Sequence, residues 1–259
     1  MSREQRDDWT ESRRGERRAA GRAGFFPGRP PLPDMVPPLA VDIDGTLTDG
    51  AGAIDPQIFD VLQAWASPVV VATGKAFPYP VALAHFLAIE RAVIAENGGV
   101  SLVGDDLVVH GDRAGAQRVA DAYRDEGYDL GWGGVDLTNR WRETEVAVSR
   151  DRPVDPLRRL AEAEGLEVVD TGYAYHVKDT DISKGRALRS VAERLGYDVT
   201  DFAAIGDSKN DAHMFEEVGT SYAVANADEH ALAAADHVTD ASYADGFVEA
   251  AEAVIERAE

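Results

Sequence analysis

Short apolar runs alternate with helical patterns in the first half of the chain. Continuous apolar runs at 39–43, 69–72 and 92–95 predict buried strands. Between them, apolar residues recur at helical spacing over 55–65 and 78–90. Strands without a polar face that alternate with helices are typical of parallel βαβ units, in which helices cover both faces of the sheet.

The pattern changes between residues 101 and 180, where apolar and polar positions alternate over short stretches. Such alternation predicts strands with one solvated face, and it surrounds two helical patterns. The expected strands are 106–110, 144–149, 166–170 and 174–178, and the expected helices are 112–127 and 153–164. Strands grouped with two helices in this way favour a small α+β domain inserted into the parallel one.

The parallel pattern returns after residue 181. Ser183 is placed to cap a helix that Gly196 would end, and an apolar run over 202–205 predicts the next strand. A further strand is expected at 222–225, with more helices after it. The predicted fold class is therefore α/β, a doubly wound, Rossmann-like parallel sheet with a smaller α+β domain inserted into it.

The chain accordingly divides into three parts, with a core at 39–100 and 181–259 and the inserted domain at 101–180. Residues 1–38 lack apolar periodicity and contain six prolines towards their end, and residues 1–30 hold eight arginines and five acidic residues. We expect a disordered extension there, or one added by a start codon placed upstream of Met35. A basic arm for nucleic acid is the alternative, and the mixed charge disfavours it.

Composition narrows the class of protein. A chain of 259 residues with 44% hydrophobic residues can bury a full core. It has no cysteine, which excludes disulfides, thiolate nucleophiles and Cys-ligated metal sites. No apolar run approaches the roughly 18 residues of a membrane-spanning helix, and the N-terminus lacks the apolar segment of a signal peptide. We expect a cytoplasmic protein that does not enter membranes.

The charge balance is strongly acidic. The net charge is -21, from 47 acidic and 26 basic residues, and a phosphate backbone would repel such a chain, so we expect no nucleic-acid partner. The lysines are Lys75, Lys178, Lys184 and Lys209, and the other basic residues are arginines. An acidic surface poor in lysine suits concentrated salt, where a short Debye length screens self-repulsion.

Asp42 and Asp44 stand two residues apart at the end of the first expected strand. In an extended strand their carboxylates would point to the same side. Such a pair persists where a cation, a shared proton or open solvent relieves the repulsion. The alternative is a polar strand end with an Asp-Gly turn at Gly45, and the motif alone leaves both interpretations open.

Other polar residues follow expected strands or begin expected helices, namely Thr73, Lys184, Asp207 and Asp211. In parallel sheets, ligands bind at the carboxyl ends of the strands. With the two aspartates, these residues would form a site of four carboxylates, one ammonium and one hydroxyl. Taken alone, each of them is as readily a solvated surface group.

A site of carboxylates without nearby Cys or His favours Mg²⁺, which accepts a few protein carboxylates together with a substrate phosphate oxygen. Lys184 would place positive charge opposite that phosphate, and the Thr73 hydroxyl and the Gly74 amide would donate hydrogen bonds to it. The site therefore predicts a small phosphorylated metabolite as the partner. The six histidines show no zinc spacing, and only His176 is a candidate for substrate contact.

Four segments resemble, in family order, the motifs of the haloacid dehalogenase-like superfamily of phosphatases. The segments are Asp42-Ile43-Asp44-Gly45-Thr46, Val71-Ala72-Thr73-Gly74, Ser183-Lys184-Gly185 and Gly206-Asp207-Ser208-Lys209-Asn210-Asp211. The resemblance covers residues 39–259. The insertion is similar to the α/β cap of the Cof-type branch, and its small size looks most like archaeal phosphoglycolate phosphatases.

The resemblance implies a role for each motif residue. Asp42 would be the nucleophile that becomes an aspartyl phosphate, and Asp44 the acid and base, which fits a double displacement by two neighbouring carboxylates. The resemblance further implies Mg²⁺ held by Asp42, the Asp44 carbonyl, Asp207 and Asp211, and substrate held by Thr73, Gly74, Lys184 and Asn210. Lys75 departs from the arginine often found at its position in the branch.

The substrate that this resemblance favours is 2-phosphoglycolate. A sugar-phosphate phosphatase of the same branch is the alternative, because the cap selects the substrate and the sequence does not expose its pocket. A catalytically silent binding domain is a third interpretation, which the retained motif residues disfavour. The sequence leaves the oligomeric state open, a homodimer included.

Overall fold

The computed structural model describes residues 36–258. The expectation of a disordered extension concerns residues 1–38, and up to residue 35 it lies outside the described residues. Its last part differs from the expectation, because Val36 is buried and the Trp65 indole donates to the Pro37 carbonyl at 2.9 Å. No helix among the described residues has both the length and the apolar character needed to cross a membrane.

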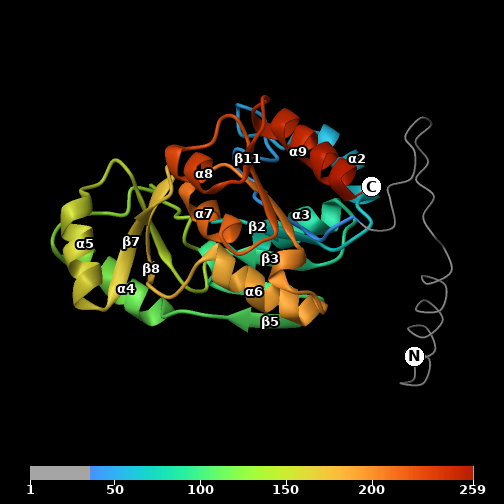
Figure 1. The fold of residues 1–259 in the computed structure, drawn as a ribbon. Helices are drawn as coiled ribbons and strands as arrows, with labels where there is room; N and C mark the ends of the chain where they lie inside the picture. The colour runs from blue at the N-terminus through green and yellow to red at the C-terminus, as the bar shows by residue number, and fades with distance from the viewer. Residues whose placement is uncertain (1–35, 259) are drawn as a thin grey trace, which may run out of the picture. The chain divides into compact units, whose positions relative to one another are not determined.

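The described part of the chain alternates strands and helices (Figure 1). The strands are β1 Leu39–Val41, β2 Val69–Ala72, β3 Ala92–Ala95, β4 Val100–Val103, β5 Asp106–Val109, β6 Val146–Ser149, β7 Leu166–Asp170, β8 Ala174–Asp179, β9 Ala203–Gly206, β10 Thr220–Ala223 and β11 His237–Val238. The helices are α2 Gln57–Ala64, α3 Pro78–Phe86, α4 Arg113–Asp125, α5 Val154–Ala163, α6 Lys184–Leu195, α7 Lys209–Phe215, α8 Glu229–Ala234 and α9 Tyr243–Ala258, with 3-10 turns η1 Glu96–Gly98 and η2 Val199–Asp201.

The larger sheet has eight described strands in the order β11-β10-β9-β1-β2-β3-β4-β5. All neighbours from β11 to β3 pair in parallel, whereas β4 and β5 form an antiparallel edge. The chain builds outwards from β1 to β3 on one side and from β9 to β11 on the other. The strand order therefore reverses between β1 and β9, and such a switch point is where open α/β sheets bind ligands.

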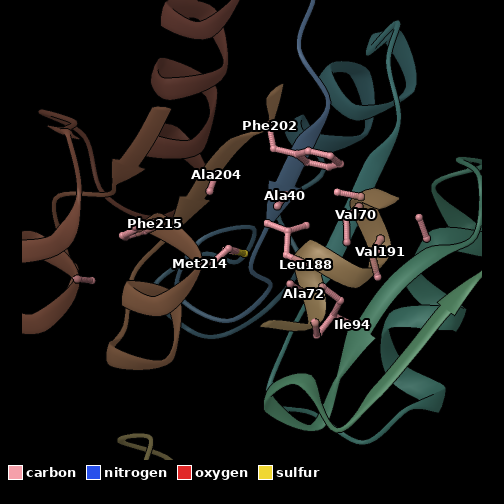
Figure 2. Close-up of a cluster of buried hydrophobic side chains, with 14 of the residues drawn as sticks. Ala40, Val70, Ala72, Ile94, Leu188, Val191, Phe202, Ala204, Met214 and Phe215 are labelled. Atoms are coloured by element: carbon pink, nitrogen blue, oxygen red, sulfur yellow. The ribbon is translucent and has the colours of Figure 1, made fainter. Parts of the chain in front are cut away.

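Side chains of the central strands alternate between the two faces of this sheet. Val70 belongs to a buried cluster with Leu188 of α6 and Met214 of α7 (Figure 2). The next residue, Val71, packs on the opposite face with Ala84 of α3. Because both faces are covered by helices, the strands are apolar throughout. The structure confirms the doubly wound α/β class.

A second sheet of three strands, in the order β6-β8-β7, is antiparallel. Helices α4 and α5 pack on it and on each other, at the left of Figure 1. Together they enclose a hydrophobic cluster of their own, centred on Tyr123, Leu157 and Val177. We call these five elements the insert. The expected strands and helices between 112 and 178 all lie in it, with ends shifted by a few residues.

Strand β5 differs from the expectation that residues 101–180 form one inserted domain. It pairs with β4, which pairs with β3, so both strands extend the larger sheet. An alternating pattern indicates one covered face but does not say which sheet the strand joins. In the structure, the elements of the insert begin only at Arg113.

Gly111 and Ile182 stand at the two connections between the larger sheet and the insert. Gly111 has a φ of +108°, and a Cβ atom there would lie 2.6 Å from Ile182 Cδ1. The chain therefore enters and leaves the insert side by side, through a passage that a side chain at Gly111 would obstruct. We call this passage the neck.

Candidate active site

Three neighbouring strands of the larger sheet end at residues that the sequence grouped into one site. Asp42 follows β1, Thr73 follows β2 and Asp207 follows β9, and β1 lies between the other two. Lys184 begins α6 and Asp211 lies in the first turn of α7. Parallel pairing places these ends at one edge, at the switch point of the sheet. Residues that the sequence separates widely are thus brought together.

The turn after β1 separates the two expected catalytic aspartates. The strand ends at Val41, before the expected Ile43, and Leu47 N–H donates to the Ile43 carbonyl at 2.9 Å. Asp42 is buried, with 4% of its surface exposed, whereas the Asp44 side chain is 54% exposed. The two carboxylates do not share one environment, because the chain turns between them instead of continuing as a strand.

Gly45 allows this turn to pass close to Asp207. Its φ is +79°, in the left-handed region, and a Cβ atom there would lie 2.0 Å from Asp207 Oδ2. A residue with a side chain would be strained at this φ and would displace the carboxylate. The Asp-Gly turn and the paired aspartates, weighed as alternatives in the sequence, are therefore parts of one arrangement.

Lys184 is the cation at the centre of the cluster. Its Nζ donates to Asp42 Oδ1 at 2.5 Å and to Asp211 Oδ1 at 2.7 Å, and its side chain is fully buried. Burial alone would lower the pKa of Lys184, but the carboxylates of Asp211 and Asp42 raise it well above its ordinary value. Lys184 therefore stays charged. Its burial contradicts the alternative that it is a solvated surface lysine.

Asp211 is held in place by the start of α7. Its Oδ2 accepts the backbone N–H groups of Asp207 and Ser208, both at 3.1 Å, while its Oδ1 accepts from Lys184. Ser208 and Asp211 also form the capping box that begins the helix. The position of this carboxylate is thus fixed by the local fold before any ligand binds.

The cluster has the donor set of a magnesium site. Carboxylate oxygens of Asp42, Asp207 and Asp211 lie within 4.8 Å of one another. Asp207 Oδ1 is buried and has no hydrogen-bond partner among the described residues. A buried acceptor without a partner is costly, and a hard cation would satisfy it. The residues present therefore fit Mg²⁺.

The pKa values of the clustered carboxyl groups also favour a bound cation. Burial and the nearby Asp211 carboxylate raise the pKa of Asp207 to about 7. Burial also raises the pKa of Asp42, together with the Asp211 and Asp207 charges, although Lys184 opposes the shift. One ammonium does not offset three carboxylates, so the site holds a proton unless another cation takes its place.

Asp44 is placed apart from these three carboxylates. Its side chain forms an ion pair of 3.0 Å with Lys75, whose Nζ lies 6.0 Å from the centre of the Tyr173 ring in the insert. The Asp44 carbonyl, the fourth expected metal ligand, accepts no hydrogen bond from the described residues. The sequence did not indicate the pairing of Lys75 with Asp44.

Thr73 and Gly74 follow β2 as expected, but only one of them faces open space. Thr73 is fully buried, and its hydroxyl accepts the Lys75 N–H at 3.1 Å. Gly74 lines the cavity described next, as does Asn210, whose side-chain amide donates to Asn97 Oδ1 at 3.0 Å. The Thr73 side chain does not line this cavity, so the expected hydrogen bond from its hydroxyl to a ligand stays a prediction.

A cavity of about 290 Å³ opens above the aspartates. Residues of the larger sheet's loops form one wall, among them Asp42, Asp44, Gly74, Asp207 and Asn210. The other wall belongs to the insert and its loops, with Arg142, Thr171, Tyr173 and His176. Of this second wall, the sequence singled out only His176. Nothing in the spacing around Arg142 marks it, because it lies in an irregular loop before β6.

A larger cavity of about 450 Å³ lies beside α6 and α7. It shares Asn97, Lys184 and Asn210 with the surroundings of the site, but Asp42 and Asp207 do not line it. Chemistry at the aspartates therefore belongs to the smaller cavity, although the other one is larger.

Comparison with known proteins agrees with this geometry. A family profile described as haloacid dehalogenase-like hydrolase matches residues 39–116 and 164–250. A protein of Natronomonas pharaonis named phosphoglycolate phosphatase is 59% identical over 218 residues, which cover 83% of this chain and 96% of that protein. A protein of the same name from Halobacterium salinarum is 57% identical, covering 84% and 97%.

A solved structure shows the same fold. The crystal structure of a Thermoplasma acidophilum protein matches with a TM-score of 0.75 and 26% sequence identity, over 85% of this chain and 98% of that chain. The family profile and the two relatives confirm the resemblance that the four motifs carried. The chain therefore belongs to the haloacid dehalogenase-like hydrolases and is an enzyme of that family.

Proposed function

We propose that this enzyme is a Mg²⁺-dependent phosphatase that hydrolyses 2-phosphoglycolate to glycolate and phosphate. The carrying observation is the buried cluster of three carboxylates around Lys184, with Asp207 Oδ1 left without a partner. The names of the two haloarchaeal relatives support the choice of substrate. We propose Asp42 as the nucleophile, and Asp44 as the acid and base.

In the first step, an Asp42 carboxylate oxygen would attack phosphorus while the bond to the ester oxygen breaks. The leaving alkoxide would take the proton of Asp44 and depart as glycolate's hydroxyl. Asp44 is suited to this exchange because its side chain is open to the cavity, whereas Asp42 is buried and held by Lys184. The product of this step is an aspartyl phosphate.

In the second step, the Asp44 carboxylate would take a proton from water as the water oxygen attacks the aspartyl phosphate. The bond between phosphorus and Asp42 breaks, which returns both carboxylates to their initial state. Splitting the hydrolysis in this way uses one group twice, first as acid and then as base. Lys75 would hold Asp44 in position through their ion pair.

Mg²⁺ would be held by Asp42, the Asp44 carbonyl, Asp207 and Asp211. When bound, it would offset the charge of the phosphate and of the carboxylates that surround it. The N–H groups at Gly74 and the Asn210 side chain, both on the cavity wall, are proposed to bind substrate oxygens together with Lys184 and Thr73. Lys184 would draw electron density from the same oxygens.

The insert is proposed to act as the cap that selects the substrate. It supplies one wall of the cavity, so its residues would meet the part of the substrate beyond the phosphate. A location in the cytoplasm and an adaptation to concentrated salt, which agrees with the haloarchaeal relatives, belong to the same proposal. A homodimer is a further part of this proposal.

A phosphate-release panel in high KCl tests this function. The full chain is assayed with 2-phosphoglycolate, hexose phosphates and mannosylglycerate phosphate, each with Mg²⁺ and with EDTA. We expect the highest kcat/KM for 2-phosphoglycolate and no turnover in EDTA. A hexose phosphate as the best substrate would replace the substrate assignment, and no hydrolysis of any ester with Mg²⁺ would instead indicate a silent binding domain.

A further inference from the structure

Glu145 joins Arg142 and His176 in the wall that the insert contributes. Its buried carboxylate accepts from Arg142 Nη1 and lies 2.7 Å from His176 Nδ1, both through Oε1. Its Oε2 accepts from Asn97 Nδ2 at 3.1 Å. Burial would raise the pKa of Glu145, but His176, Arg142 and Asn97 lower it to about 2, so the carboxylate is ionised.

The ionised Glu145 fixes which edge of His176 is free. A carboxylate without a proton can only accept, so His176 Nδ1 carries a hydrogen and donates to Glu145. His176 Nε2 has no hydrogen-bond partner among the described residues, although only 1% of the residue's surface is exposed. The ring lines the cavity, so this nitrogen is available to whatever fills it.

Arg142 has a free edge as well. Its Nε donates to the Thr138 carbonyl at 3.1 Å, and its Nη1 donates to Glu145 and, at 3.0 Å, to the Gly74 carbonyl. Nη2 has no hydrogen-bond partner in the part of the chain that the structure describes. The residue is 6% exposed and lines the same cavity. Both residues line the same cavity, so their free edges are available to one ligand.

Hydrogen bonds connect Arg142 and His176 to the loops that carry the aspartates. The bond from Arg142 to the Gly74 carbonyl places the guanidinium beside the residue that follows Thr73. Asn97 continues the connection, because it donates to Glu145 and accepts from Asn210. Residues of the insert are thus linked by hydrogen bonds to two of the loops that hold the proposed phosphate site.

We propose that Arg142 and His176 bind the carboxylate of the substrate, on the wall of the cavity that the insert and its loops contribute. This inference rests on the proposed function. In 2-phosphoglycolate a single methylene separates the carboxylate from the ester oxygen, so a carboxylate site must lie close to the phosphate site, as the Gly74 contact requires. Arg142 Nη2 would donate to one carboxylate oxygen, and His176 Nε2 would donate to the other when the ring carries its second proton.

The charges around the cavity favour this orientation of the substrate. Asp42 and Asp207 would repel a carboxylate, whereas the Arg142 guanidinium attracts one, although the ionised Glu145 offsets part of its charge. Asp44 and Lys75 are paired with each other and largely offset. A sugar hydroxyl is uncharged and gains less from a guanidinium than a carboxylate does, so Arg142 also discriminates against hexose phosphates.

The test compares 2-phosphoglycolate with ethyl phosphate, which has no carboxylate. The readout is the ratio of the two kcat/KM values for the wild type, Arg142→Lys and His176→Gln, in Mg²⁺ and high KCl. Lysine keeps the charge but loses the planar fork, and glutamine loses the imidazole. We expect the ratio to fall about 100-fold in either variant, mainly through the KM for 2-phosphoglycolate.

Matched controls are Arg140→Lys and His230→Gln, because both residues are exposed and neither lines the cavity. We expect the wild-type ratio in both. If Arg142 and His176 only brace the insert, their variants lose activity on both substrates equally and the ratio stays constant. A constant ratio in folded variants, verified by circular dichroism, would overturn the inference.

A binding measurement tests the carboxylate site independently of the proposed phosphatase activity. Calorimetry on the Asp42→Asn protein with Mg²⁺ compares the Kd values for 2-phosphoglycolate and ethyl phosphate without any turnover. We expect tighter binding of 2-phosphoglycolate, and loss of that preference when Arg142→Lys is added. Equal Kd values in Asp42→Asn would reject the carboxylate site even if the wild type is an active phosphatase. A preference without wild-type turnover would reject the phosphatase and keep the site.

Discussion

Lys184 Nζ lies 2.5 Å from Asp42 Oδ1, although 142 residues separate the two in the chain. The contact joins the first strand of the larger sheet to the first helix after the insert. It also brings a buried ammonium against a carboxylate that has two further carboxylates nearby. The fold therefore concentrates negative charge at one place and offsets only part of it, which is the condition for binding a divalent cation and a phosphate together.

Asp42→Asn is expected to abolish turnover of phosphate esters, by about 10³-fold or more, because the amide is not a nucleophile for phosphorus. Phosphoenzyme, detected by the mass of the acid-quenched protein, should be absent as well. Asp60→Asn, an exposed aspartate on α2, is the control and should keep both. Normal turnover in the Asp42 variant would show that another group attacks phosphorus.

Lys184→Met should destabilise the protein in EDTA by about 3 kcal/mol, because it leaves buried carboxylates without their cation. Chemical denaturation measures this loss, and added Mg²⁺ should recover part of it. Lys209→Met is the matched control, since Lys209 is exposed at the start of α7. Equal stability of the two variants would mean that Asp42 and Asp211 do not repel as the geometry implies.

The Mg²⁺ effect on stability should depend on pH through Asp207, whose pKa is about 7 in place of 3.8. Between these values the folded protein holds a proton that the unfolded chain releases, so without metal the free energy of unfolding falls as the pH rises. Mg²⁺ requires the ionised carboxylate. The Tm gain on adding Mg²⁺ should therefore be larger at about pH 8 than at about pH 5.5.

Asp207→Asn provides the control for this pH dependence. The amide does not titrate, so the variant should show a smaller Mg²⁺ gain and less change of that gain with pH. Scanning calorimetry with and without Mg²⁺ measures both proteins. A gain that is the same at both pH values in the wild type would remove Asp207 from the metal site.

Gly45→Ala should weaken Mg²⁺ binding at least tenfold, because the new Cβ would lie 2.0 Å from Asp207 Oδ2 and displace it. Gly52→Ala is the control, because it introduces the same backbone strain without a clash. Gly52 has nearly the same φ, +80° against +79°, but nothing lies within 4 Å of its Cβ position. Both variants should lose about 1 kcal/mol of stability, and only Gly45→Ala should shift the Mg²⁺ titration of activity.

Unfolding midpoints should rise from low to molar KCl. The net charge of -21 makes the folded protein repel itself, and salt screens that repulsion. Thermal unfolding monitored by circular dichroism across a KCl series measures the effect. A sodium sulfate series separates screening from general salting-out, because sulfate strengthens apolar burial as well. A flat or falling KCl series would contradict adaptation to salt.

Much of the larger sheet was predictable because its strands are apolar on both faces and its helices are capped by recognisable residues. Ser183 and Gly196 were expected to begin and end a helix, and they flank α6 with a Ser183 side-chain bond and a left-handed Gly196. The carboxyl ends of β1, β2 and β9 followed from the same pattern. The sequence alone therefore predicted that the residues after these strands lie close together.

The rest depends on contacts that no local pattern encodes. Asp44 was expected beside Asp42, but the turn at Gly45 and the ion pair with Lys75 place it on the open side. Arg142 lies in an irregular loop, and its importance comes from Glu145 and Gly74. Neither partner can be chosen from spacing along the chain, because charged loop residues have many solvated alternatives.

The neck at Gly111 and Ile182 has an evolutionary consequence. A chain that leaves and rejoins the larger sheet at one point can exchange everything beyond that point without moving the strands of that sheet. The insert brings its own hydrophobic cluster, so it can be grafted as a cassette between related enzymes. With the proposed roles of the two parts, substrate selectivity in the insert and chemistry in the larger sheet can diversify separately.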